Sequence, residues 1–213
     1  MTILVRCAAT GISALVLLAG CAGAPASAPS GATAPSSGET STSATAGTSV
    51  PPSATSGGQV FAVQSVGISL SLPSDFVILD KSKAAADPYW QDVADRTGTE
   101  AEDLKAIVDS FDGVAVGPDG TQISLAKRDR FKSMPSVEAV EDDLAGMPNS
   151  GVREIETPLG AGIRVSLQLG TSRFQEFVYL PGAAGVVSLS IGSRTESGAV
   201  ELFEQVLPTV SAM

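Results

Sequence analysis

The sequence GIRVSLQLGTSRFQEFVYLPGAAGVVSLSIGS, residues 162–193, alternates apolar and polar side chains over long runs. Alternation with a period of two is typical of strands that bury one face, and glycine or proline separates the runs. Together with the segment before it, this stretch predicts four strands joined by short connections. They are Val152–Thr157, Ile163–Leu169, Ser172–Leu180 and Val186–Gly192. Strands that follow one another this closely pair as an antiparallel meander.

Further strands and helices are predicted on either side of the meander. Alternation predicts strands over Gln59–Ser65, Ile68–Leu72, Phe76–Leu79, Val114–Gly117 and Thr121–Lys127. Helical spacing of apolar residues predicts helices after Asp87-Pro88, after Thr99, over Ser136–Met147 and after Ser193. Thr99 to Glu102 and Ser193 to Glu196 match the capping-box pattern. The predicted fold class is α+β, a mainly antiparallel sheet flanked by helices, since the regular strand–helix alternation of a doubly wound fold is missing.

Composition excludes several classes of function. The 213 residues include 13 basic and 23 acidic side chains, a formal charge of −10, with two cysteines and no histidine. The acidic balance argues against nucleic acid as a partner, because its recognition requires a basic surface. Without histidine the chain lacks the commonest general base and the commonest metal ligand.

The N-terminal segment has the pattern of an export signal. A short basic start at Arg6 precedes the apolar run Cys7–Leu18, which ends in Leu18-Ala19-Gly20-Cys21. These four residues resemble the bacterial lipobox, which implies a signal peptide over residues 1–20 and diacylglycerol on the sulfur of Cys21. The open alternative is an ordinary signal peptide in which Cys21 is incidental. A lipid anchor at Cys21 would hold the chain to the membrane, and the mature chain would then keep no free thiol.

The segment after Cys21 is predicted to be a disordered linker, ending at residue 58. Every residue of 22–58 except Glu39 and Val50 is Ala, Gly, Pro, Ser or Thr, so the segment has almost nothing to bury. As a flexible coil it would span roughly 35 Å. A serine- and threonine-rich stalk of this kind is also a candidate for O-glycosylation. Residues 59–213 are predicted to form a single α+β domain.

Several of these features together resemble a known family. They are the lipobox, the low-complexity stalk, an opening strand ending Leu72-Pro73-Ser74-Asp75-Phe76, and a last strand leading into a C-terminal amphipathic helix. The chain is similar in these respects to actinobacterial lipoproteins of the mycobacterial LpqN-like type, over about Val60–Ala212. The resemblance implies a PsbP-like α/β/α sandwich, an envelope location and a non-enzymatic role. It supplies no catalytic residues, and Phe76 stands where the family often has tryptophan.

No pattern of catalytic or metal-binding residues stands out. A serine–histidine–aspartate triad is impossible here. Ser124-Leu125-Ala126-Lys127 matches a Ser-x-x-Lys pattern but lies in an alternating strand, without the companion motifs of the enzymes that use it. Glu141-Asp142-Asp143 lacks the spacing of a calcium loop and is read as a solvated helix face. We therefore expect no metal and no cofactor.

One face of the meander is the candidate ligand-binding surface. A two-residue turn at Gly170-Thr171 would place Gln168 opposite Arg173, Ser166 opposite Gln175, and Arg164 opposite Phe177. The predicted face then contains Arg164, Gln168, Arg173, Gln175, Phe177 and Tyr179, with Ser188 and Ser190 from the next strand. Arginine offers charge-assisted contacts and tyrosine an amphipathic platform. The alternative is a sheet face that is simply solvated.

The sequence thus predicts a monomeric, non-enzymatic lipoprotein on the outer side of the membrane. It would bind an envelope lipid, glycan or protein partner. A small hydrolase using carboxylates or Ser/Lys, and a purely structural envelope component, are the alternatives.

Overall fold

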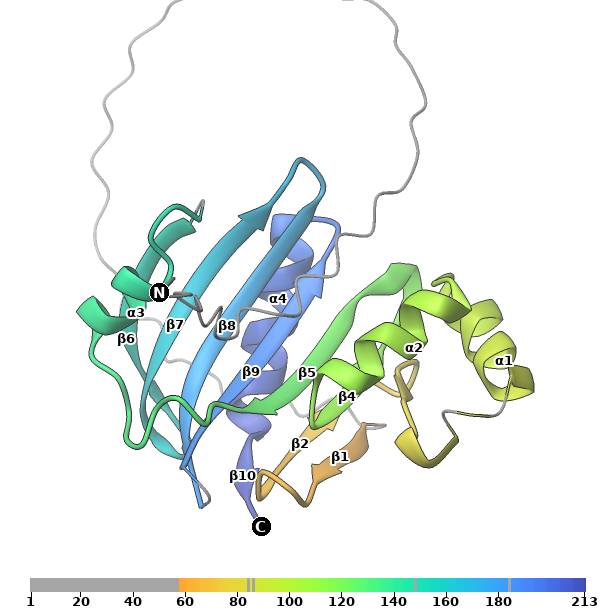
Figure 1. Ribbon diagram of the computed structural model, residues 1–213, viewed down its shortest axis with the longest axis horizontal. Coiled ribbons are helices and arrows are strands. Elements are labelled where there is room, and N and C mark those ends of the chain that lie inside the picture. The colour runs from red at the N-terminus through yellow and green to blue at the C-terminus, as the bar shows by residue number, and fades with distance from the viewer. Residues whose placement is uncertain (1–57, 84, 86, 148, 184) are drawn as a thin grey trace, which may run out of the picture. The chain divides into compact units, whose positions relative to one another are not determined.

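Seven strands form the main sheet of this chain, in the spatial order β3-β4-β5-β9-β8-β7-β6, and every neighbouring pair is antiparallel. The computed structural model (Figure 1) describes residues 58–213 except residues 84, 86, 148 and 184. The predicted signal segment, Cys21 and nearly all of the predicted linker lie outside the described residues. The strands are β3 Val77–Ile78, β4 Gly113–Val116, β5 Gln122–Lys127, β6 Asn149–Thr157, β7 Gly160–Leu169, β8 Arg173–Gly182 and β9 Gly185–Ser193.

A second, three-stranded sheet joins the beginning of the described chain to its end. β2 (Ile68–Leu72) lies between β1 (Gln59–Val63) and β10 (Ser211–Ala212), and both pairings are antiparallel. Four α-helices complete the fold: α1 Asp87–Thr97, α2 Ala101–Ser110, α3 Val137–Asp143 and α4 Glu196–Val206. The structure therefore confirms the α+β class with mainly antiparallel sheets and flanking helices.

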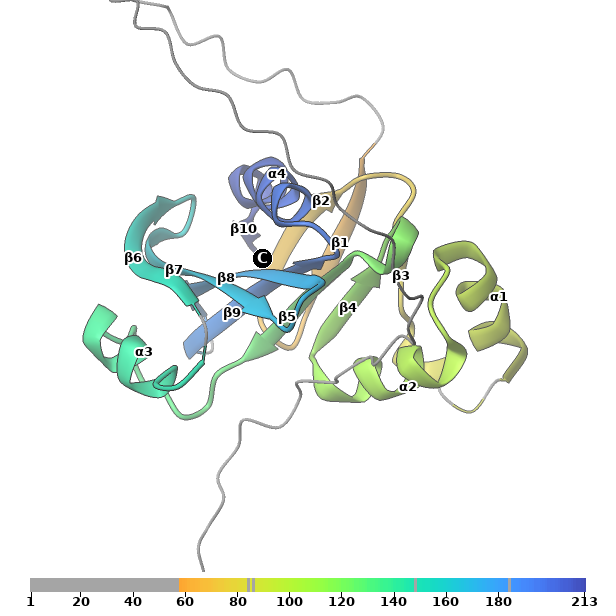
Figure 2. The same cartoon turned by 90° about the horizontal axis from the view of Figure 1, so that it is seen from above.

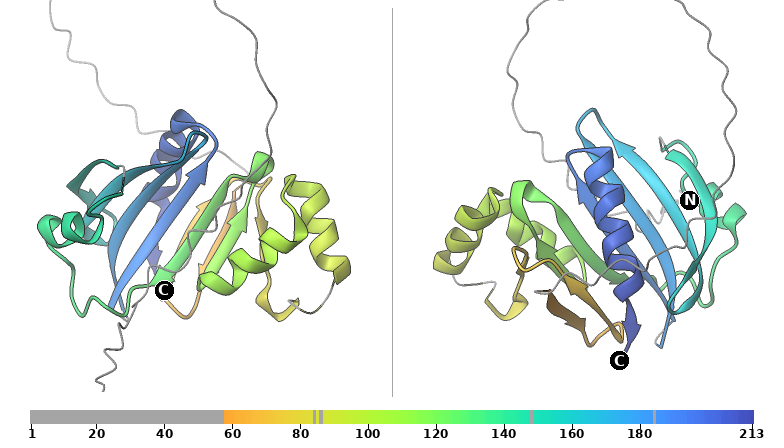
Figure 3. Two further views of the ribbon diagram at one scale, coloured as in Figure 1. Left: turned by 45° about the horizontal axis from the view of Figure 1, so that its top comes forward. Right: turned by 180° about the vertical axis from the view of Figure 1, so that it is seen from behind.

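The helices lie on both faces of the seven-stranded sheet. Figure 2 shows α4 with β1 and β2 on one side of the sheet, and α2 and α3 on the other. The two views of Figure 3 separate the same groups, with α4 crossing β8 and β9 when the molecule is seen from behind. The side that faces α4 is called the α4 face below, and the side that faces α2 and α3 is called the α2/α3 face.

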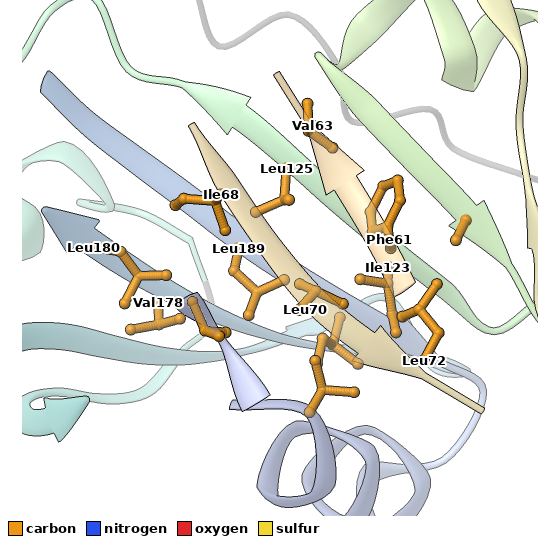
Figure 4. Packing of buried hydrophobic residues seen from close by; sticks show 14 of the residues in the cluster. Phe61, Val63, Ile68, Leu70, Leu72, Ile123, Leu125, Val178, Leu180 and Leu189 are labelled. Carbon is orange, nitrogen blue, oxygen red and sulfur yellow. The ribbon is translucent and has the colours of Figure 1, made fainter. Parts of the chain in front are cut away.

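The α4 face carries the largest apolar core. The alternating residues Ile68, Leu70 and Leu72 of β2 are almost fully buried and pack against β5, β8 and β9, as Figure 4 shows. Phe203 and Val206 of α4 join the same cluster. The period-two pattern of β2 and the helical stripe of α4 thus converge on one side of the main sheet.

Two smaller cores lie on the α2/α3 face, at opposite ends of the sheet. One gathers under α1 and α2 around Trp90, Val93 and Leu104, and it includes Val114 and Val116 of β4. The other gathers under α3 around Val140 and Leu144. Its sheet residues are Ile163, Val165, Leu167, Tyr179 and Val186. No single core therefore covers this face from edge to edge.

Both predicted capping boxes are wrong. The residue before α2 is Glu100, and its side chain makes no capping hydrogen bond. At α4 the cap is Thr195, whose Oγ1 accepts from the backbone N–H of Gly198 at 3.1 Å. A capping box requires the hydroxyl three residues before the acidic side chain, and in each case the helix begins after a different residue.

Other predicted boundaries hold more closely. Gly98 follows α1 with φ of +65°, as a helix-ending glycine does. Pro208 lies in a short 3-10 helix, Leu207–Thr209, which follows α4 directly, since proline does not continue an α-helix. The helix predicted over Ser136–Met147 is shorter, because α3 ends at Asp143. Among the helices of residues 58–213, none combines the length and apolar character needed to cross a bilayer.

Candidate functional site: a serine strip on the main sheet

The β7–β8 hairpin has a register that differs by one residue from the predicted one. Leu169 pairs with Arg173, so the loop is Gly170, Thr171 and Ser172, and Gly170 has φ of +69°. A three-residue hairpin loop with a left-handed glycine is a common solution. A slip of one residue moves every side chain of a strand to the other face relative to its neighbour. The predicted polar face is therefore divided between the two sides of the sheet.

Arg164 and Gln168 follow the alternation of β7 onto the α4 face. Arg164 Nε donates to Glu176 Oε2 at 2.7 Å, and Ser166 Oγ donates to the same oxygen at 2.8 Å. The Arg164 guanidinium also lies 4.3 Å from the ring centroid of Phe203 on α4. Arg164 is 9% exposed and Glu176 3%. Arg164 is thus a buried charge paired within the chain and lies on the opposite face from Arg173, so the predicted grouping of Arg164 with the β8 residues on one ligand-binding face is wrong.

The residues of β8 that were predicted with it lie on the opposite, α2/α3 face. Arg173, Gln175, Phe177 and Tyr179 alternate along β8, and the last three pair with Gly192, Ser190 and Ser188 of β9. The other edge of β9 pairs with β5. There the same three residues of β9 lie opposite β5 residues in the pairs Gln122–Gly192, Ser124–Ser190 and Ala126–Ser188. We call these last six residues the serine strip: Gln122, Ser124, Ala126, Ser188, Ser190 and Gly192.

The serine strip lies between the two smaller apolar cores. Its neighbours on one side are Val114 and Val116 of β4, under α2, and on the other Phe177 and Tyr179 of β8, towards α3. Every side chain in the strip is small or polar, although both neighbouring cores are apolar. Ser124, Ser188 and Ser190 are nonetheless 1 to 2% exposed. A row of small hydroxyls at this place therefore separates two cores instead of joining them.

Hydrogen bonds fix most of the strip. Arg128 Nε donates to Ser188 Oγ at 2.8 Å, and Ser188 Oγ donates to the carbonyl of Ala126 at 3.4 Å. Gln175 Nε2 donates to Ser190 Oγ at 2.5 Å. At the other end, Arg173 Nη2 donates to Gln122 Oε1 at 3.2 Å. These bonds hold three of the strip's four polar side chains, Gln122, Ser188 and Ser190, in defined positions.

Ser124 is the exception in the centre of the strip. Its Oγ is buried and has no hydrogen-bond partner, a property shared among the described residues only with Thr99 Oγ1. Leaving a buried hydroxyl unpaired costs about 1–3 kcal/mol. Such exceptions in a folded protein call for an explanation, and one explanation is a bound molecule.

An arginine stands at each end of the strip, and both are half-buried. Burial lowers the pKa of Arg173, and the neighbouring charge of Arg194 lowers it further, whereas Asp103 opposes these effects. Burial is also the main cause that lowers the pKa of Arg128. There Arg130 adds to the effect, and Tyr179 and Asp143 oppose it. The ion pairs of the described residues use other cations, so neither end has a carboxylate in direct contact.

Among the described residues, neither the Ser124–Lys127 pattern nor the acidic run at 141–143 gathers into a cluster of catalytic or metal-binding groups. Ser124 and Lys127 lie three residues apart on β5, so their side chains point to opposite faces, and Lys127 Nζ pairs with Asp129 at 2.9 Å. Asp143 pairs with Arg130. Within residues 58–213, leaving out the four undescribed positions, no three histidine, cysteine or acidic side chains are grouped as metal ligands.

The sequence does not predict three polar residues of the site, Gln122, Ser124 and Arg128, as members of this face. It also does not identify Glu176, on the opposite face, as the partner of Arg164. Gln122, Ser124 and Arg128 belong to β5 and its end, and only strand order brings them beside β9. The alternation of Gln122 and Ser124 with the buried Ile123 and Leu125 was a usable signal for two of them.

Comparison with known proteins finds a likeness among solved structures. No family model matches the chain, and no curated protein matches it. The solution structure of cyanobacterial PsbP (CyanoP) from Synechocystis sp. PCC 6803 is similar with a TM-score of 0.43 and 10% sequence identity. The match covers 78% of this chain and 98% of that one.

Proposed function

We propose that this chain is a non-enzymatic binding module that a lipid on Cys21 holds at the outer face of a membrane, with the serine strip as its ligand site. Its ligand is a hydroxylated molecule of the cell envelope, of the lipid or glycolipid class. The motif Leu18-Ala19-Gly20-Cys21 supports the anchor, and the resemblance to LpqN-like lipoproteins of actinobacteria supports the envelope location.

The unpaired hydroxyl of Ser124 is the observation that carries the proposal. It lies beside Ser190 in a row of hydroxyl and amide groups. Hydroxyls both donate and accept hydrogen bonds, so such a row fits the hydroxyls of a sugar or polyol. A ligand hydroxyl at Ser124 would supply the missing hydrogen bond and recover its cost.

The flanking cores give the strip the composition of a small-molecule site. Binding sites are lined mainly by apolar and aromatic side chains with a few placed polar groups. Phe177 and Tyr179 supply aromatic surface along one border of the strip, and Tyr179 stacks edge-on against Phe131 with the ring centroids 5.7 Å apart. The amide of Gln175 and the hydroxyls of Ser188 and Ser190 supply directed polar groups.

Mass spectrometry tests both parts of the proposal. The full chain is produced in its own organism and extracted from the membrane fraction, and its intact mass and its copurifying small molecules are measured. We expect a chain that begins at Cys21 with a diacylglycerol addition and carries an envelope molecule. An unprocessed, unacylated chain would overturn the anchor.

Matched variants connect the copurifying molecule to the strip. Ser124→Ala removes the buried hydroxyl without adding atoms, whereas Ser71→Ala makes the same change at an exposed hydroxyl on β2. The amount of bound molecule should fall in Ser124→Ala and stay unchanged in Ser71→Ala. Equal amounts in both variants would overturn the strip as the ligand site.

A further inference from the structure

We infer that the ligand of the serine strip carries a phosphate group, and that this group binds at the end of the strip formed by Arg173, Arg194 and Gln122. This inference rests on the proposed function and specifies the chemistry and the orientation of its ligand. The phosphate belongs either to a free phosphate ester or to a lipid headgroup.

Two arginines meet at this end of the strip. Arg173 lies at the start of β8, and Arg194 follows the end of β9 directly. The Arg173 guanidinium reaches over Gly192, since a Cβ added at that glycine would lie 3.4 Å from Arg173 Nη2. Glycine at this position therefore leaves room for the guanidinium to lie against the strand.

The polar groups around the two arginines are incompletely satisfied. A Cβ added at Gly120 would lie 3.4 Å from Thr99 Oγ1 and 3.9 Å from Arg194 Nη2, so that hydroxyl and that guanidinium border the same point. Thr99 Oγ1 is the second buried hydroxyl without a partner in the described part of the chain. One unpartnered hydroxyl thus lies on β5 within the strip, and the other lies beside Gly120, two residues before β5, next to Arg194.

The charges favour an anion here. The guanidinium charge of Arg194 repels that of Arg173, and the partial burial of Arg173 strengthens this repulsion, whereas Arg194 itself is exposed. Asp103 on α2 is the acidic group that acts on Arg173, and it is not within direct ion-pair distance. Guanidinium groups bind phosphate oxygens through two parallel hydrogen bonds. An oxyanion between Arg173 and Arg194 would remove the repulsion and use donors that the fold leaves available.

The other end of the strip is less suited to an anion. The Nε of Arg128 is already engaged by Ser188. Arg130 lies near Arg128, but it already pairs with Asp143, and both Asp143 and the Tyr179 phenol favour the charged form of Arg128. Gly192 lies four positions after Ser188, so the strip is about 13 Å long at the rise per residue of a strand. The ligand therefore has a direction, with its phosphate at Gly192 and its hydroxylated part towards Ser188.

Phosphorus NMR of small probes tests the inference. The full chain in detergent is titrated with inorganic phosphate, with glycerol 1-phosphate and with glycerophosphoglycerol, and the broadening of each ³¹P line gives an apparent affinity. The first two probes represent free phosphate and its monoester, and the third represents a lipid headgroup. We expect the preferred probe to lose at least tenfold in affinity in the Arg173→Gln, Arg194→Gln double variant.

Two control variants make the result specific. Arg153→Gln removes an exposed arginine on β6, and Arg96→Gln removes an exposed arginine on α1. Neither should change the affinity by more than about twofold. Equal losses in either control and in the double variant would overturn the assignment of the phosphate to this end of the strip.

The outcomes separate this inference from the proposed function. If none of the phosphate probes binds while a neutral envelope molecule copurifies through Ser124, the phosphate inference is wrong and the proposed function stands. If the probes bind and the double variant binds them equally well, the phosphate inference is wrong as well. If neither the probes nor any copurifying molecule depends on the strip, both proposals fail.

Discussion

The α4 face and the α2/α3 face of the main sheet differ in whether an arginine has a counter-charge within the chain. On the α4 face, Arg164 has its counter-charge in Glu176, a shared hydrogen bond from Ser166 and the ring of Phe203 beneath it. On the α2/α3 face, Arg173 of the same hairpin contacts an amide and stands near a second arginine. The charge of Arg164 is thus neutralised within the chain. Arg173 has no carboxylate in direct contact, so its guanidinium keeps N–H donors for a ligand.

Removing Glu176 should produce the largest effect on stability. Glu176→Gln leaves the buried Arg164 without its counter-charge, and breaking a buried pair costs about 3–5 kcal/mol. Urea unfolding followed by circular dichroism measures the loss. The control is Glu154→Gln, which changes an exposed glutamate on β6 and should shift stability by less than about 0.5 kcal/mol. Similar losses in the two variants would show that the pair is not buried as described.

Replacing both members of the pair should restore most of that loss. Arg164→Met combined with Glu176→Leu fills the site with apolar side chains beneath α4, and such replacements are often neutral or stabilising. The same unfolding measurement should place the double variant close to the unsubstituted chain. A double variant as unstable as Glu176→Gln would mean that the charges themselves are needed for the fold.

On the α2/α3 face, loss of a satisfied hydroxyl should cost less. Ser188→Ala removes the acceptor for Arg128, and a hydrogen bond to a charged group contributes roughly 1.5–3 kcal/mol. Because Arg128 is only half-buried, water can replace part of this contact, and we expect a loss of about 1 kcal/mol. No measurable change would indicate that the Arg128–Ser188 contact does not form in solution.

The smallest effect, with the opposite sign, is expected at Ser124. Ser124→Ala removes a buried hydroxyl that has no partner, so stability without ligand should rise by up to about 1 kcal/mol. Ligand binding should weaken in the same variant. A gain in stability together with weaker binding is typical of a residue kept for function. A loss of stability would instead show that Ser124 has a partner in the folded chain.

Much of this fold was predictable from short-range patterns. The alternation in Ile68–Leu72 placed that strand at its observed bounds, and the four meander strands were found with small changes at their ends. The stripe on α4 was found because helical periodicity extends over several turns. The helix starts at Thr99 and Ser193 were misassigned, because several neighbouring residues could serve as the cap.

The candidate site was predictable only in part, and the hairpin loop explains why. A two-residue loop at 170–171 and a three-residue loop at 170–172 can both begin with Gly170. Their registers differ by one residue, so the two loops place opposite sets of β8 side chains on the same face as Arg164. The predicted face therefore grouped Arg173, Gln175 and Tyr179, which share one face of the sheet, with Arg164, which lies on the other. The contribution of Gln122 and Ser124 depends on β5 lying beside β9, a long-range pairing that local sequence does not specify.

The most direct test of the contrast between the two faces is NMR of the arginine Nε–H groups in the full chain, labelled with ¹⁵N in detergent. The resonances are assigned with single arginine variants and followed as a lipid extract of the source organism's membranes is added. The account predicts that the Arg173 resonance shifts in a saturable way, whereas that of Arg164, held by Glu176, stays in place. A shift at Arg164 with none at Arg173, or no saturable shift at either, would contradict it.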